Sequence, residues 1–230
     1  MHRFLALLLC GCVVEAGQYS ATFAGKDADG VRVDKVKGTV TIDAKIAPRK
    51  LAYLKGEVYP LEVIACWAHP KGKKAHETIV TIEALPSAVH KAIEGLGLTA
   101  GAPIMGGEKE IPKGPDVNLF IEVPTPEGAF RRVTMDKAMV DSRTGKAFPK
   151  SVKWRFTGSV LSRPDPNKDE KAYGADLSGT LAVIFPVSNQ TVLQTNLPMA
   201  YEKLLKLETN PKALPKEGTP VRLVIEIPKK

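Results

Sequence analysis

A succession of short strand-like runs, each bounded by turn residues, constrains the fold of this chain most strongly. In the run 39–46 every second residue is apolar, so that Val40, Ile42, Ala44 and Ile46 share one face. Further alternating or continuously apolar runs follow at 61–67, 78–82, 117–123, 129–134, 153–161, 176–185, 191–195 and 221–227. Such runs at close spacing predict a sheet that contains most of the chain.

One segment shows helical rather than strand periodicity. Its apolar residues are spaced i, i+3, i+4 and i+7 over about 87–96, and they are Val89, Ala92, Ile93 and Leu96. Pro86-Ser87 offers an N-cap, and Gly95 ends the helix. A weaker helical turn is expected over 199–205. We therefore predict an α+β fold of mainly antiparallel β-sheet with one clear amphipathic helix.

The first sixteen residues are typical of an export signal. A short basic head precedes an apolar run over 4–14, and Ala16 supplies the small residue needed for cleavage. The run is too short to span a bilayer. We expect residues 1–16 to be a signal peptide and residues 17–230 to form a single domain, with a possible seam at 99–116.

A second processing route is also open. The stretch from Leu9 to Cys12 resembles a bacterial lipoprotein box, in which the signal ends before Cys12 and Cys12 becomes lipidated. Either route predicts an exported chain, periplasmic or lipid-anchored to the cell envelope, with Cys66 as the one cysteine of the folded body and no internal disulfide. The remaining alternative is an ordinary buried N-terminal segment.

Composition narrows the classes of function and of partner. The chain has 33 Lys and Arg against 25 Asp and Glu, which gives 33 − 25 = +8 at neutral pH. No phosphate-binding loop or dinucleotide glycine fingerprint follows a strand-like run, and the sequence has no Gly-x-Ser-x-Gly elbow. No nucleic-acid-reading motif is evident. We expect the partner to be an envelope protein or an anionic envelope polymer or lipid, and no membrane-spanning segment after processing.

Three lysines crowd one predicted turn and are the candidate binding residues. In this prediction 66–69 faces 76–78 in a hairpin, and Lys71, Lys73 and Lys74 form its basic tip. Such a cluster attracts anionic surfaces in a salt-sensitive way. The alternative is that these lysines are an ordinary solvated face.

A cluster of potential metal ligands lies in the same part of the chain. His69, His76 and His90 fall within 22 residues, together with Cys66 and Glu77. Imidazole, thiolate and carboxylate groups are ligands that zinc and copper prefer. These five residues are therefore the candidate metal site, although no paired Cys-x-x-Cys spacing is present.

The same residues also fit structural roles. His76 and Glu77 are adjacent, so an extended strand would send them to opposite faces, where they would make hydrogen bonds at a strand start. His90 can pair with Glu94 four residues further along the helix. Cys66, between Ala65 and Trp67, fits a small buried apolar residue.

Eight segments together resemble the YdjY-domain proteins of planctomycete-type bacteria. The resemblance spans roughly residues 38–228 and is carried by Ile46 to Leu51, Tyr53 to Gly56, Lys71 to Thr78, Ser87 to Ala92, Lys153 to Ser159, Tyr173 to Thr180, Leu207 to Asn210 and Leu214 to Val221. It implies an exported protein without an established activity. Members are sometimes met beside ferredoxin-like proteins, but this chain lacks the cysteines that an iron–sulfur cluster needs.

These observations favour a non-enzymatic, exported binding or scaffold domain without a cofactor. The alternative is a metal-binding or redox-accessory protein that holds zinc or copper around His76. A third and weaker hypothesis is an envelope hydrolase.

Overall fold

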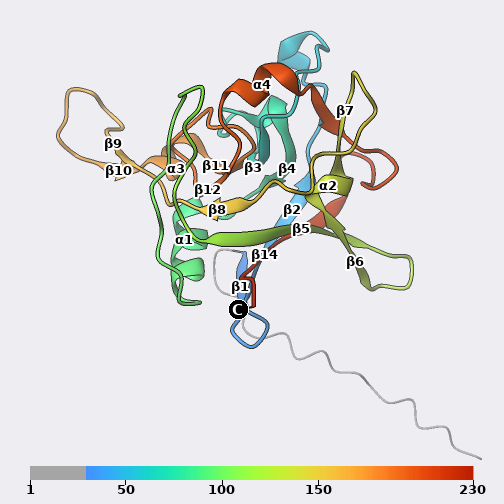
Figure 1. The fold of residues 1–230 in the computed structure, drawn as a ribbon, viewed down its shortest axis with the longest axis horizontal. Coiled ribbons are helices and arrows are strands. Elements are labelled where there is room, and N and C mark those ends of the chain that lie inside the picture. Colours follow the sequence, from blue (N-terminus) through green and yellow to red (C-terminus); the bar gives the residue numbers. More distant parts are fainter. Residues whose placement is uncertain (1–29, 230) are drawn as a thin grey trace, which may run out of the picture.

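The computed structural model describes residues 30–229, and one large sheet dominates them (Figure 1). The predicted signal segment 1–16 and Cys12 lie outside the described residues. Ten strands join the sheet: β1 Val31–Asp34, β2 Thr39–Ile46, β3 Val63–Trp67, β4 Thr78–Ile82, β5 Asp116–Pro124, β6 Phe130–Thr134, β8 Trp154–Phe156, β11 Thr180–Val183, β12 Leu193–Thr195 and β14 Pro220–Glu226.

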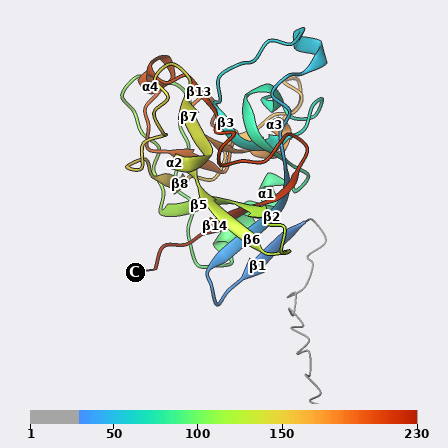
Figure 2. The ribbon, with the colours of Figure 1, turned by 90° about the vertical axis from the view of Figure 1, so that its right-hand side faces the viewer.

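Eight of these strands close on themselves in a barrel-like arrangement. The order is β2-β14-β5-β8-β12-β11-β3-β4, and β4 pairs back with β2 to complete the ring. β1 and β6 are added outside it, on β2 and β5 (Figure 2). The pairs are antiparallel except β3 with β4 and β11 with β12. The predicted α+β class with a mainly antiparallel sheet is confirmed.

The core is formed by the apolar faces that the sequence pattern predicts. Along β2 the four alternating apolar residues are buried, whereas Asp43 and Lys45 on the other face are exposed. The predicted helix is α1 Pro86–Glu94, which lies against β1 and β2 and buries Val89 and Ile93 in the same core. The sheet and its helix therefore share one large apolar interior, and a smaller apolar cluster is formed by Val63, Cys66, Ala75 and Val183.

Shorter elements surround the sheet. They are the pair β9 Leu161–Ser162 with β10 Ala172–Tyr173, the pair β7 Met139–Asp141 with β13 Leu207–Thr209, the helices α2 Met135–Ala138, α3 Gly174–Ser178 and α4 Ala200–Leu204, and the 3₁₀ turns Ala52–Leu54 and Ala75–Glu77. Helix α4 confirms the helical turn expected over 199–205. Among residues 30–229, none of the helices combines the length and the hydrophobicity required to cross a membrane.

Three local predictions are corrected. The run 153–161 is not one strand, because Gly158 adopts a φ of +65° and turns the chain between β8 and β9. The run 176–185 begins as helix α3, which Gly179 ends in the left-handed conformation before β11 starts. Ser87 does not cap α1. Its backbone N–H instead donates to Oδ1 of Asp176 at 2.9 Å, so a carboxylate of α3 satisfies this end of α1.

The predicted hairpin between 66–69 and 76–78 is also wrong, because β3 and β4 are parallel. Val63 pairs with Thr78 and Trp67 with Ile82, so the connection 68–77 returns along the length of β3 before β4 begins. The return is short for a parallel connection, which usually takes a dozen residues or more. It starts with a tight turn in which the Gly72 N–H donates to the carbonyl of Ala68 at 2.9 Å.

This turn predicts a strict requirement for glycine at position 72. A Cβ there would lie 1.8 Å from the carbonyl oxygen of Trp67, and backbone atoms cannot move aside as a flexible side chain can. We expect Gly72→Ala to lower the free energy of unfolding, measured by urea denaturation, by about 3 kcal/mol or more. Gly128→Ala is the control. Its φ is +78° but no atom lies within 4 Å of the added Cβ, so it should cost about 1 kcal/mol. Equal losses in the two variants would contradict the close approach.

Candidate functional site

A network of charged side chains joins the connection 68–77 to the start of β3. The Lys74 ammonium lies 2.7 Å from a carboxylate oxygen of Glu62 and 2.7 Å from one of Glu77. His76 Nε2 lies 3.2 Å from the other carboxylate oxygen of Glu77. Burial raises the pKa of Glu62, and the neighbouring Glu77 carboxylate adds to this effect. Lys74 is thus paired with two acids of the protein and is not available to an external partner.

Arg49 links this network to the C-terminal part of the chain. Its side chain is buried, and it donates to the backbone carbonyls of His76, at 2.9 Å, and of Tyr59. It also lies 3.4 Å from the carboxylate of Glu208, and its backbone N–H donates to Glu217 at 2.7 Å. No sequence motif singles out Arg49. The available signal was its place in a segment that carries the family resemblance.

The structure does not bring the five predicted metal ligands together. Within residues 30–229, no group of three or more His, Cys, Asp and Glu residues is placed to hold a metal ion. His76 and Glu77 are neighbours, as described. His69 stacks on Tyr53 instead, with ring centroids 4.2 Å apart.

The parallel register explains why His69 and His76 are separated. His69 follows the end of β3, whereas the backbone carbonyl of Glu77 accepts from the N–H of Glu62, just before β3 starts. The five residues of β3 therefore lie between the two histidines, which corresponds to roughly 15 Å along the strand. A hairpin would have placed the two histidines opposite each other.

His90 has a separate set of contacts, between α1 and the strands β8 and β10. Its Nδ1 lies 2.7 Å from the hydroxyl of Tyr173, and its ring meets the ring of Phe156 edge-on. The predicted pairing with Glu94 is confirmed, at 3.3 Å from Nε2. Gly158 passes so close that an added Cβ would lie 3.1 Å from the imidazole. His90 thus joins α1 to β8 and β10.

Cys66 is a buried core residue, as its apolar flanks indicate. Its side chain is fully buried beside Val63, Ala75 and Val183. Burial raises the pKa of its thiol to about 12. The thiol therefore stays protonated at neutral pH, and metal binding and nucleophilic chemistry both require the thiolate.

Of the three predicted binding lysines, Lys71 and Lys73 are exposed and Lys74 is not free. The loop 50–60 extends the exposed charge, because the stacking of Tyr53 on His69 holds it against the connection 68–77. Four lysines of these two segments are exposed and have no ion-pair partner among residues 30–229: Lys50, Lys55, Lys71 and Lys73. We call these lysines, with Tyr53, Val58 and His69, the basic surface.

The backbone at Lys55 is unusual. Its φ is +53°, and no other non-glycine residue between positions 30 and 229 has a positive φ. An L-residue in the left-handed region costs roughly 1–2 kcal/mol relative to the right-handed conformation. The fold therefore tolerates local strain to place a lysine where glycine would fit better, and retained strain of this kind is typical of functional positions.

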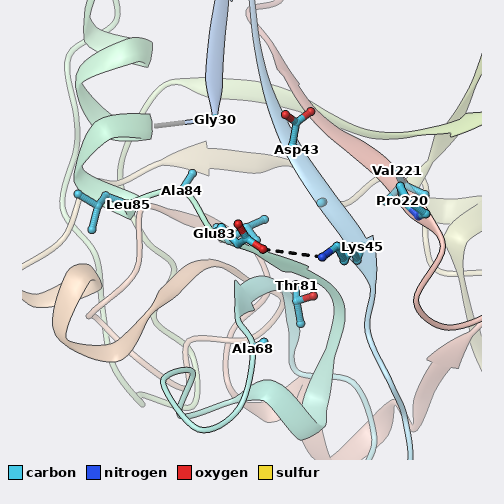
Figure 3. Close-up of a pocket in the computed structure, with 12 residues that line it drawn as sticks. Gly30, Asp43, Lys45, Ala68, Thr81, Glu83, Ala84, Leu85, Pro220 and Val221 are labelled. Carbon is cyan, nitrogen blue, oxygen red and sulfur yellow. Dashed lines mark ion pairs between the residues drawn. The ribbon is translucent and has the colours of Figure 1, made fainter. Parts of the chain in front are cut away.

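A groove of about 700 Å³ lies elsewhere, over the outer face of β2 and β4 (Figure 3). In Figure 3 the side chains of Asp43 and Lys45 rise from β2, and that of Glu83 reaches toward Lys45 from the end of β4. Lys45 and Glu83 are 3.8 Å apart, and Arg32 donates to Asp43 at 2.8 Å. The two acids are matched by two cations, so the groove lacks the excess of one charge that the basic surface has.

The position of His76 predicts a contribution to stability that acid removes. Burial and the charges of Lys74 and Arg49 lower its pKa below the usual 6.5, despite the nearby Glu62. A group with a lowered pKa stabilises the fold above its unfolded pKa, and this stabilisation is lost as the pH falls through the folded value. Protonation would also add a donor at Nδ1, which has no partner among the described residues.

We therefore expect the free energy of unfolding to decline below about pH 6.5, and His76→Gln to reduce that decline. The measurement is urea denaturation across the pH range. His69→Gln, at an exposed position, is the control and should keep the decline. At each pH the free energy of unfolding of each variant is subtracted from that of the unmodified chain. This difference cancels the effect of Glu62, whose raised pKa stabilises the fold as the pH falls. Parallel pH profiles for His76→Gln and the unmodified chain would contradict this role.

The comparisons with known proteins agree with the resemblance seen in the sequence. The family described as "YdjY domain" matches residues 31–226, from the first strand to the last. No curated protein and no solved structure matches the chain. Since the match covers nearly all of the described structure, the chain belongs to the YdjY domain family.

Proposed function

We propose that this chain is an exported, non-enzymatic binding domain of the cell envelope of a planctomycete-type bacterium. It docks on anionic envelope material through the basic surface. The observation that carries the proposal is the gathering of four exposed lysines, without an ion-pair partner in the described part of the chain, on two segments that a ring stack holds together. Lysines that form no ion pair with an acid of the described structure remain available to an anionic partner.

The contrast with Lys74 supports this assignment. Lys74 belongs to the same short connection, yet it lies against Glu62 and Glu77 and holds the connection to β3. Lys71 and Lys73, which flank the buried Gly72, are exposed on the same segment. One connection thus separates a lysine that stabilises the fold from two that face solvent.

The contacts of the chemically capable residues support a binding role rather than catalysis. Cys66 is a protonated core thiol, and His90 is engaged by Tyr173 and Glu94. His76 lies between Glu77 and the ring of Tyr59. The contacts of Cys66, His90 and His76 within the fold account for their positions.

A paired charge reversal tests docking through the basic surface. We expect Lys71→Glu/Lys73→Glu to lose most of its retention by the total envelope fraction of the producing cells. Removing a lysine from a charged surface contact costs about 1 kcal/mol, so two removals alone predict a weakening of roughly 30-fold. Added salt should weaken the unmodified protein in the same direction. The measurement is co-sedimentation with the envelope fraction over a range of salt concentrations.

The matched control is Lys35→Glu/Lys229→Glu, which changes the net charge equally. Both lysines are exposed and have no ion-pair partner among residues 30–229. They lie in the β1–β2 turn and near the C-terminus, at the opposite end of the molecule from the loop 50–60 in Figure 1. If both double variants sediment alike, docking through the basic surface is refuted and only net charge matters.

Export has its own test. Mass spectrometry of the chain recovered from bacterial cells should find either an N-terminus at Gly17 or a lipid-modified N-terminal Cys12. Replacing Ala16 with a bulky residue should block the first form, and Cys12→Ser should abolish the second. Recovery from the cytosol with Met1 to Ala16 still attached would sink the assignment to the envelope.

A further inference from the structure

The basic surface carries apolar and aromatic side chains among its lysines. Tyr53 is 48% exposed and Val58 42% exposed, although both belong to the large apolar residues that usually turn inward. They lie on the same loop as Lys50 and Lys55. Attraction of a polyanion by charge alone does not require exposed apolar groups on the loop that carries the lysines.

Lysine combined with exposed tyrosine and aliphatic groups matches one kind of partner. The ammonium groups meet the anionic headgroups of a bilayer, and the apolar groups enter the boundary between headgroups and acyl chains. Tyrosine is enriched at this depth because its ring is apolar and its hydroxyl is polar. A hydrated polymer offers the charge but no apolar layer.

The local construction of the loop agrees with shallow insertion. The 3₁₀ turn Ala52–Leu54 ends at Lys55, whose strained conformation turns the chain, and no buried residue lies in that turn. Glu57 is the one acid of the loop, and it accepts from the hydroxyl of Tyr59 at 3.0 Å. The exposed part of the loop thus consists mainly of lysine and apolar side chains.

We infer that the anionic partner of the basic surface is a lipid bilayer, into whose headgroup region Tyr53 and Val58 insert while the four lysines contact anionic headgroups. This inference rests on the proposed docking function and names its partner. Attraction by charge alone would depend on the lysines only. Insertion makes binding depend on the apolar side chains as well.

The experiment uses the exported and processed chain in a Cys12→Ser background, so that no lipid anchor contributes. The probes are vesicles of phosphatidylcholine, vesicles that also contain phosphatidylglycerol, and heparin resin as a polyanion without a bilayer. We expect binding to the anionic vesicles and little to the neutral ones. Val58→Ser, which leaves the ring stack of Tyr53 on His69 in place, should weaken vesicle binding by about fivefold and leave retention on heparin unchanged.

Two further variants separate insertion from loss of structure. Val36→Ser removes an apolar side chain that is 95% exposed in the β1–β2 turn, and it should bind vesicles as the unmodified chain does. Lys55→Gly removes a charge and relieves the backbone, so it should unfold no earlier than the unmodified chain yet bind anionic vesicles about fivefold more weakly.

The outcomes distinguish the inference from the function on which it rests. If Val58→Ser binds anionic vesicles as well as Val36→Ser does, insertion is overturned. Retention on heparin without binding to anionic vesicles overturns the bilayer and favours a polymer, while docking through the lysines stands. Failure of the Lys71 and Lys73 reversal to alter retention by the envelope fraction overturns the docking function itself.

Discussion

The parallel pairing of β3 with β4 is the constraint on which the rest of the structure depends. β4 closes the eight-strand ring because it pairs with β3 on one side and with β2 on the other. Its direction forces the ten-residue connection 68–77 to return along β3, and this return sets the position of every residue in it. Gly72 passes the backbone of Trp67, Glu77 arrives beside Glu62, and Lys71 and Lys73 remain on the surface.

Two polar junctions hold the outlying segments to this ring. Arg49 joins the segment after β2 to the connection 68–77 and to residues near the C-terminus. His90 and the carboxylate of Asp176 join α1 to β8, β10 and α3. Most of the segments that carry the family resemblance meet at one of these two junctions. The segments that carry the family resemblance therefore mainly connect the outlying parts of the chain to the sheet.

The sequence predicts the parts of this fold that depend on local periodicity. The alternation in 39–46 and the helical stripe over 87–96 reproduce β2 and α1, because each buries one face of a regular element. Burial of Cys66 and the pairing of His90 with Glu94 are likewise local. Strand direction is not local: the same residues form a hairpin or a parallel pair according to the path of the connection. The five-ligand cluster is predicted from nearness in sequence, and the path of that connection separates His69 from His76 and Glu77.

The central place of β14 has a consequence for when this molecule can form. β14 lies between β2 and β5, which are 70 residues or more apart in sequence, and it comes after both of them in the chain. Until those residues emerge, β2 and β5 each lack a neighbour and the ring stays open. A chain still attached to the ribosome before β14 is made would therefore have an open ring, and closure would follow the synthesis of that strand.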